Sequence, residues 1–304
     1  MRKPKAIAEK FDLRVISLPR IGSLLPCNPS IIGNDDGFLC LYSGVNYDLK
    51  KTGYLKAYDK ELGSPSSNEL YLVRLNSKLE ILSAELLVQA IFPPFEMVDR
   101  ISDPRLFQYK SSVFFLAALH TSDSASPIGY RSEQALFEMD DGEHRLIKRF
   151  ASPEDIEKNW TPISDGRGLA FYRSDPPFVI SMLDDVDQEE LARHKVNETR
   201  GGSNVVYFRG SYYAIVHHTR YKTDARHEFF NHYSKRVYSH QLIRFGADFS
   251  ILARSEWFSF FGAEVEFCMG LDLSDETATI SVGVWDQEAK IILMNTGDLL
   301  SLLN

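Results

Sequence analysis

Residues 200–218, RGGSNVVYFRGSYYAIVHH, decide the fold class of this chain. Small polar residues open the stretch, an apolar run follows, and Arg209-Gly210 separates that run from a second run rich in aromatic residues. β-Branched and aromatic residues favour strands, and a Gly-containing pair between two such runs is typical of a hairpin turn. The stretch therefore predicts a β-hairpin over 203–218.

Short runs of the same kind occur along the whole chain. They are bounded by Gly, Asp, Asn, Ser or Pro and lie at 37–45, 69–75, 112–120, 168–173, 203–208, 211–218, 240–245 and 279–285. Capped helical turns are predicted only at 152–159 and 185–195, where Ser152 and Asp185 precede acidic first turns as N-caps. The pattern predicts an all-β fold with small helical insertions.

Five units of the chain share one order of features: a polar residue beside Pro, Gly or an aromatic residue, an apolar strand, a tight polar turn and an aromatic-rich strand. Their openings are Asn28, Asp103, Asn159, Ser203 and Glu266, and their turns are 34–37, 110–111, 164–166, 209–210 and 274–276. Each interval exceeds the roughly 40 residues of a four-stranded blade, which predicts a five-bladed β-propeller and a single domain over 1–304.

A propeller would bring these distant residues together, because the innermost strand of every blade begins near the central axis. The ring is expected to close through residues 289–295 or an N-terminal strand, pairing across the ends of the chain. The alternative is a β-sandwich or a pair of sandwiches, in which the polar residues are ordinary turn formers at strand ends. That alternative gives no reason for 103–105, 158–160 and 264–266 to occupy similar places in successive units.

Composition excludes several classes of protein. Of the 304 residues, 44% are hydrophobic and 12% aromatic, which excludes disorder, and no apolar run approaches the roughly 20 residues of a membrane span. The net charge of -8 argues against a nucleic-acid partner, although scattered Arg and Lys suit a small anion such as a sugar phosphate. The N-terminus lacks an apolar secretory core, so a cytoplasmic location is expected.

Cysteine and histidine usage points to neither a disulfide framework nor a metal. Cys27, Cys40 and Cys268 are odd in number, far apart and set among apolar neighbours, which favours buried thiols. The histidines lack the spacing of metal ligands. We therefore expect no metal site and no cofactor.

Six segments, taken in order, resemble the blade signatures of a known superfamily. They are CNPSII (27–32), ISDPRLF (101–107), KNWTPI (158–163), AFYRSDPP (170–177), RGGSNVVYFRGSYYAIVH (200–217) and FCMGLDLSDETATISVGVWD (267–286). They are similar to the five-bladed propellers of glycoside hydrolase family 130, to the related β-mannosyl transferases of glycosyltransferase family 108, and to bacterial glycosyltransferase-like propeller modules. The resemblance covers nearly the whole chain and implies inverting chemistry on β-linked mannosides or similar sugars.

The resemblance also implies roles for individual residues. Asp103 matches the family's Asp-Pro-Arg signature and is the predicted general acid or base, a role that needs a pKa shifted by burial and neighbouring charges. Arg105 would orient that carboxylate or a substrate oxygen. The other predicted substrate-binding residues are Asn28, Lys158, Asn159, Arg173, Arg200, His217, Tyr238, Glu266 and Asp286, with Lys158, Arg173 and Arg200 as anion ligands.

Ordinary structural roles are the alternatives for these residues: a strand-start cap for Asp103, a surface ion pair for Arg105, and a packed aromatic ring for Tyr238. Trp160 and Trp285 offer either apolar faces for a sugar ring or core packing.

One departure from the family pattern bears on the reaction. The family usually has an Arg after the first aromatic strand, as a phosphate ligand in the phosphorylases, and this chain has Leu41, Tyr42, Ser43 and Gly44 there. The first prediction is therefore an inverting glycosyltransferase that uses a nucleotide-linked or lipid-linked sugar phosphate, with Asp103 as general base. A β-mannoside phosphorylase or hydrolase, with Glu264, Glu266 or Asp286 as a possible second carboxylate, and a non-catalytic glycan-binding propeller are the alternatives.

Overall fold

The predicted hairpins define the architecture of this chain. A computed structural model describes residues 4–34, 36–45, 68–87, 98, 100–123, 130–140, 143–150, 157–194, 199–221 and 236–303. Each of the five predicted turns joins two antiparallel strands in it. At the turn between residues 208 and 211, Arg209 and Gly210 both have positive φ, of 47° and 81°, the backbone that a tight hairpin requires. The prediction of an all-β fold is confirmed.

Within the described ranges, three antiparallel sheets have four strands each. The first contains β3 (Leu25–Asn34), β4 (Gly37–Val45), β5 (Asn68–Asn76) and β6 (Ile81–Leu87). The second contains β7 (Arg100–Tyr109), β8 (Ser112–Ser122), β9 (Tyr130–Asp140) and β10 (Glu143–Phe150). The third contains β20 (Glu266–Leu273), β21 (Thr277–Val284), β22 (Glu288–Asn295) and β2 (Arg14–Ser17).

The fourth sheet has ten strands in two parts. One part contains β11 (Thr161–Ser164), β12 (Leu169–Ser174) and β13 (Pro177–Ser181). The other contains β14 (Thr199–Arg200), β15 (Val205–Phe208), β16 (Ser211–Tyr221), β17 (Arg236–Phe245), β18 (Ile251–Arg254), β19 (Phe258–Ser259) and β1 (Lys5–Ala6). A short parallel pairing of Ile163 with Val205 and of Ser164 with Val206 joins the two parts.

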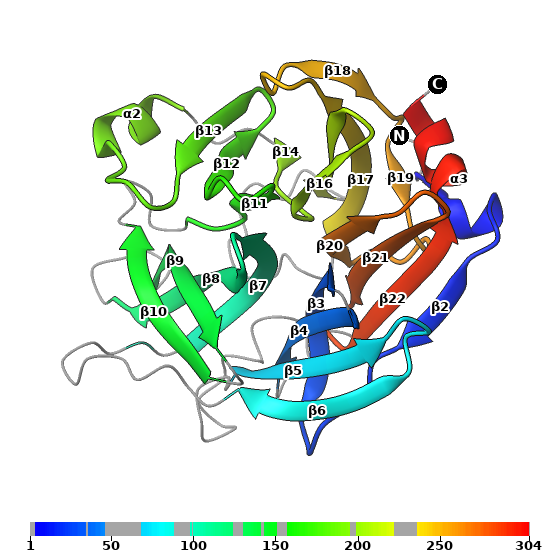
Figure 1. The fold of residues 1–304 in the computed structure, drawn as a ribbon, viewed down its shortest axis with the longest axis horizontal. Coiled ribbons are helices and arrows are strands. Elements are labelled where there is room, and N and C mark those ends of the chain that lie inside the picture. Colours follow the sequence, from blue (N-terminus) through cyan, green and yellow to red (C-terminus); the bar gives the residue numbers. More distant parts are fainter. Residues whose placement is uncertain are drawn as a thin grey trace.

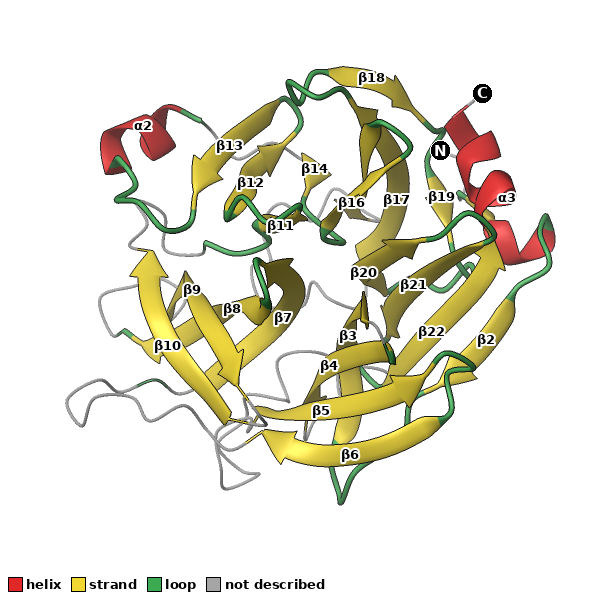
Figure 2. Ribbon diagram, viewed as in Figure 1, coloured by secondary structure: helices red, strands yellow, loops and turns green. Residues whose placement is uncertain are grey.

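The sheets stand around a common centre (Figures 1 and 2). Strands β3, β7, β11 and β20 lie near the centre, and β6, β10, β13, β18 and β2 lie at the outside. β3 packs beside both β7 and β20, β7 packs beside β11, and β20 packs beside β15 and β16. Apolar side chains fill the space between each sheet, or part of a sheet, and the next one around the centre.

A strand from the N-terminal part of the chain and a strand from the C-terminal part pair in one sheet. β2, near the N-terminus, pairs antiparallel with β22, near the C-terminus, with Val15 opposite Ile292. The prediction that the ends pair with each other is confirmed. This pairing covers the edge that β22 would otherwise expose.

The helices are short and differ in part from the predictions. The helix predicted at 185–195 is α2 (Gln188–Arg193), and its N-cap is Asp187 instead of Asp185 because the Asp187 carboxylate accepts hydrogen bonds from the amides of Glu189 and Glu190. In the predicted turn at 152–159, residues 152–156, with the proposed cap Ser152, lie outside the described residues, and residues 157–159 are not helical. The other helices among the described residues are α3 (Thr296–Leu300) and the 3-10 turns η1 (Ile7–Glu9) and η4 (Ser301–Leu303).

Two further sequence features can be compared with the structure. Cys27, Cys40 and Cys268 are buried free thiols, as predicted. None of the helices in the described part of the chain has the length and apolar character that a membrane crossing requires.

Candidate functional site

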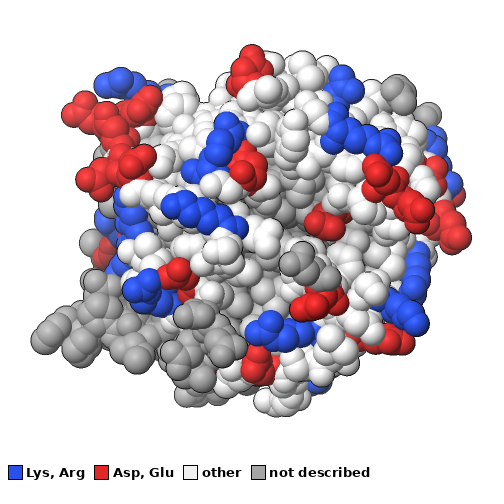
Figure 3. Space-filling view, viewed as in Figure 1, with Lys and Arg blue, Asp and Glu red and all other residues white. Residues whose placement is uncertain are grey.

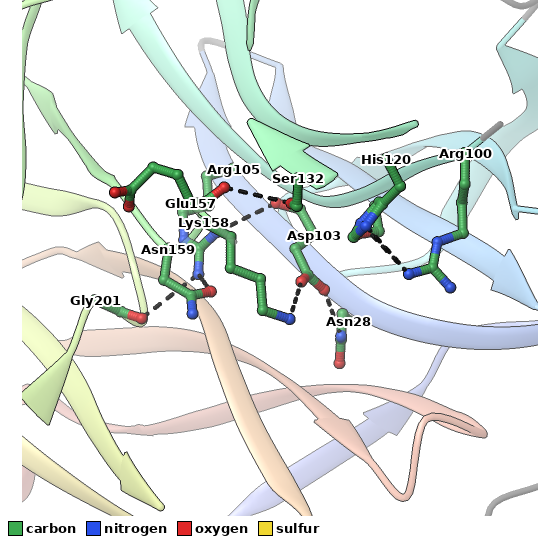
Figure 4. A network of polar contacts seen from close by, with 11 residues as sticks. Asn28, Arg100, Asp103, Arg105, His120, Ser132, Glu157, Lys158, Asn159 and Gly201 are labelled. Carbon is green, nitrogen blue, oxygen red and sulfur yellow. Dashed lines mark hydrogen bonds and ion pairs between the residues drawn. The ribbon is translucent and has the colours of Figure 1, made fainter. Parts of the chain in front are cut away.

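Three polar residues at the inner edge of the sheets have a left-handed backbone. The φ angles are 46° at Asn28, 54° at Asp103 and 72° at Asn159. Asn and Asp tolerate this region better than other residues with a β-carbon. At Asn28 and Asp103 the strand register also shifts, between Cys27 and Ser30 in β3 and in the matching place of β7. Such bulges re-aim the side chains of Asn28 and Asp103, and both residues belong with Asn159 to one polar network (Figure 4).

Asp103 is at the middle of this network. Its Oδ1 accepts a hydrogen bond from Asn28 Nδ2 at 2.8 Å, and its Oδ2 lies 3.5 Å from Lys158 Nζ. Burial raises the pKa of the carboxyl group. The charges of Lys158 and Arg105 and the hydrogen bond from the asparagine oppose burial and lower the pKa from 3.8 to about 2. The carboxylate is therefore ionised at neutral pH, where it can accept a proton but holds none to donate.

Arg105 connects several strands around the centre. It is fully buried, and its Nε donates to the carbonyl oxygen of Gly202 at 2.8 Å. Its other nitrogens donate to Asn159 Oδ1 at 3.0 Å, to the Asp103 carbonyl oxygen at 3.2 Å and to the Gly201 carbonyl oxygen at 3.5 Å. The guanidinium group thus acts on the carboxylate of Asp103 through its charge, and burial leaves it no surface for direct contact with a substrate.

Gly201 and Gly202 explain how the carbonyl groups reach Arg105. A β-carbon at Gly201 would collide with Asn159 O and Thr161 Oγ1, and one at Gly202 would collide with the Ile215 carbonyl oxygen. Only glycine lets the backbone approach this closely. The sequence pattern marks this pair as the opening of a hairpin but does not reveal its role as an acceptor for a buried arginine.

His120 and Arg100 are site residues that the sequence analysis missed. His120 Nε2 and Ser102 Oγ are 2.7 Å apart, and Arg100 Nη2 lies 3.4 Å from both ring nitrogens. Burial, then the charges of Arg100 and Lys158, keep the pKa of His120 well below 6.5, so the imidazole is neutral. The sequence contained one indication of this role. His120 ends an apolar strand, as the predicted residue His217 does in its own unit.

His217 lies in a second cluster, on the strands β14, β16 and β17. It stands opposite Arg200 on one side and His240 on the other, so the three side chains share one face of the sheet. Its ring stacks on Tyr238 with a centroid separation of 5.7 Å and meets Phe267 edge-on at 4.6 Å. Burial, then His240 and Arg200, lower the pKa of His217 well below 6.5. This arrangement places a buried, neutral imidazole beside an aromatic ring and the exposed guanidinium group of Arg200.

Arg173 lies against Glu157, a residue that the sequence analysis did not select. Arg173 Nη1 is 3.3 Å from Glu157 Oε1, and its Nη2 donates to the Tyr172 hydroxyl at 3.0 Å. Glu157 Oε1 also accepts a hydrogen bond from Trp160 Nε1 at 3.0 Å. Trp160 is fully buried against Phe150 and Tyr172, so it is a core residue and offers no face to a sugar.

The two predicted acidic residues of the last unit have different surroundings. Glu266 is fully buried, and its carboxylate accepts hydrogen bonds from the amides of Phe260, Phe261 and Ala263 at 2.6–2.9 Å. It therefore holds the segment that follows β19. The Asp286 carboxylate lies beside the Cys27 thiol, whose pKa is raised by burial and then by the charges of Asp286 and Asp103.

The predicted residues thus fall into separate groups. Asn28, Asp103, Arg105, Lys158 and Asn159 form one connected network. Arg200, His217 and Tyr238 form the neighbouring cluster, whereas Arg173 and Glu266 are engaged elsewhere. The central part of the surface carries side chains of both charges (Figure 3). In the described part of the chain, no group of three or more His, Cys, Asp or Glu side chains is arranged to hold a metal ion.

Comparisons with known proteins bear on the fold. The sequence matches no protein-family model and no curated protein. Its structure is similar to a mannose phosphorylase from Leishmania mexicana in complex with phosphate, with 13% identity, a TM-score of 0.62, and coverage of 95% of this chain and 91% of that one.

Two further solved structures are similar over most of their length. A GDP-Man-dependent mannosyltransferase from Leishmania mexicana has 14% identity and a TM-score of 0.61, with 93% of this chain and 89% of that one covered. A β-1,2-mannobiose phosphorylase from Listeria innocua has 13% identity and a TM-score of 0.58, with 96% and 93% covered. The chain therefore shares the fold of these proteins.

Proposed function

We propose that this chain is a carbohydrate-active enzyme, and that it is an inverting glycosyltransferase which takes a mannose-like sugar from a phosphate-linked donor. The observation that carries the proposal is the ionised Asp103 carboxylate, held by Asn28 and Lys158 at the inner end of the strands. Transfer to a hydroxyl group needs a base, and a carboxylate with a lowered pKa is in the required form. The shared fold with a GDP-Man-dependent mannosyltransferase supports this choice.

We also propose that the architecture is a five-bladed β-propeller in a single domain. The ten-stranded sheet then counts as two blades, since only the short parallel pairing of β11 with β15 joins its parts. Apolar clusters lie between each of the five resulting units and the next. The antiparallel pairing of β2 with β22 would close the ring.

In the proposed reaction, the acceptor hydroxyl oxygen forms a bond to the anomeric carbon on the face opposite the donor phosphate. The bond between that carbon and the phosphate oxygen breaks, and its electron pair leaves with the phosphate. The acceptor proton moves to Asp103. The Lys158 side chain is 28% exposed, so its ammonium group is available to the phosphate. Moving it away from Asp103 would raise the pKa of the carboxyl and strengthen the base.

The second candidate is hydrolysis or phosphorolysis of β-mannosides. The place of Asp286 beside Cys27 favours hydrolysis, because it supplies a second carboxylate in the region of Asp103. Both reactions require a protonated acid at the bridging oxygen, and the low pKa of Asp103 disfavours that form. Release of free mannose, or of mannose 1-phosphate, from β-mannosides without any nucleotide sugar would identify these reactions.

Replacement of Asp103 by Asn tests the proposed function. The wild type, Asp103→Asn and Asp184→Asn are incubated with GDP-mannose or other nucleotide sugars and short mannoside acceptors, and products are measured by mass spectrometry. Asp184 is exposed and serves as the control. We expect Asp103→Asn to fold but to lose about 100-fold or more in kcat, and Asp184→Asn to match the wild type. Undiminished transfer by folded Asp103→Asn rejects the assignment.

A further inference from the structure

Residues 157–160 form a short connection whose side chains point to two different places. Lys158 and Asn159 reach the network around Asp103, as Figure 4 shows. Glu157 and Trp160 bond to each other instead, with the indole Nε1 3.0 Å from the Glu157 carboxylate. The four residues precede β11 and are not part of a strand, so no sheet ladder holds them in place.

Glu157 attaches this connection to the second sheet. Its amide donates to the Ser132 carbonyl oxygen at 2.7 Å, and its own carbonyl oxygen lies 3.4 Å from Ser132 Oγ. The side chain is only 2% exposed, and its Oε1 meets both Trp160 and Arg173. A buried carboxylate is tolerated only with a partner charge and hydrogen bonds, and here both are present.

Arg173 is held as the partner charge of this carboxylate. Its Nη1 contacts Glu157 at 3.3 Å and the Tyr172 carbonyl oxygen at 3.0 Å, and its guanidinium carbon lies 3.8 Å from the centre of the Tyr172 ring. The side chain is 11% exposed. These contacts orient Arg173 toward the carboxylate from the neighbouring strand β12.

We propose that Glu157 is a positioning residue that, with Arg173 as its counter-ion, directs Lys158 and Asn159 toward Asp103 and Arg105. The backbone of Glu157 fixes the start of the connection to β9, and its carboxylate fixes the end of the connection through Trp160. The two residues between these points then have little freedom except to face the centre. The expected effect of Glu157 on catalysis rests on the proposed function. Its expected effect on the position of Lys158 does not.

The test uses Glu157→Gln in the 304-residue chain, with Glu138→Gln as the matched control. Glu138 forms an ion pair with Arg145 on the outer strands of the same sheet, so its replacement removes a pair away from the site. The pKa of Asp103 is measured by carbon-13 NMR titration of the carboxyl group, assigned by comparison with Asp103→Asn. Displacement of Lys158 removes a nearby cation, so we expect the Asp103 pKa to rise by at least about 1 unit in Glu157→Gln and not in the control.

The second measurement separates this proposal from the proposed function. If transfer is observed, Glu157→Gln is expected to lower kcat at least tenfold, while Glu138→Gln leaves it unchanged. If the wild type transfers no sugar, the proposed function fails but the titration still decides the role of Glu157. If Glu157→Gln does not fold, Trp160→Phe removes the indole hydrogen bond at constant charge and is expected to raise the Asp103 pKa by a smaller amount. An unchanged Asp103 pKa in the folded variant overturns the positioning role.

Discussion

Replacement of Arg105 by Met distinguishes a structural link between strands from a substrate ligand. The fully buried guanidinium donates to Gly202 O at 2.8 Å, Asn159 Oδ1 at 3.0 Å and Asp103 O at 3.2 Å. Each buried acceptor left without a donor costs about 1–3 kcal/mol, so three cost about 3–9 kcal/mol before water enters. Burial lowers the pKa of Arg105 from 12.5 to about 10, which corresponds to about 3 kcal/mol that the substitution relieves. The net expectation is a loss of up to about 6 kcal/mol in the free energy of unfolding, with a central value of about 3 kcal/mol.

Urea unfolding at pH 7, followed by tryptophan fluorescence, measures this loss. Arg145→Met is the control, because that side chain is 74% exposed and its ion pair with Glu138 is worth about 1 kcal/mol or less. Arg105→Lys keeps the charge but lacks the planar fork, so its stability is expected to lie between those of the wild type and Arg105→Met. An unfolding midpoint and m-value equal to those of the wild type for Arg105→Met would refute the structural role.

Three further outcomes are expected from the same structure. Lys158→Met should raise the pKa of Asp103 by about 1–3 units, because a cation 3.5 Å from the carboxylate is lost. A carbon-13 NMR titration measures this pKa, and an unchanged value would show that the ion pair is broken in solution. Gly283→Ala would place a β-carbon against the side chain of Asn28 and 2.9 Å from its backbone nitrogen. Thermal unfolding should therefore show a loss of about 1–3 kcal/mol in the free energy of unfolding, and wild-type stability would contradict this close contact. Burial lowers the pKa of His240 from 6.5 to about 3. As pH drops below 6.5, the unfolded state therefore binds a proton at His240 before the folded state does, and the free energy of unfolding falls. His240 accounts for a fall of about 2 kcal/mol in the free energy of unfolding between pH 6.5 and 5. Urea unfolding of His240→Leu should therefore show a correspondingly smaller fall over that range than the wild type shows.

The strands and their turns were predictable from the sequence because a hairpin is a local structure. Alternation, aromatic content and turn residues such as Arg209-Gly210 act within about ten residues, and they placed β4, β5 and β8 within one or two residues of their observed ends. The pairing of the chain ends followed from the need to cover exposed strand edges, and β2 and β22 satisfy it. The cap of α2 was misplaced, because Asp185 and Asp187 are chemically alike and only the backbone geometry selects Asp187.

The order of the polar openings also indicated Asn28, Asp103 and Asn159 as related positions, but their partners depend on the tertiary structure. Asn28 and Asp103 are 75 residues apart in the sequence, and Arg105 and Gly202 are 97 apart. No local pattern encodes such contacts, because the packing of one sheet on the next decides which side chains meet. Local preferences are therefore enough to predict the strands. The charge and direction of each side chain at the centre depend instead on neighbours contributed by other sheets.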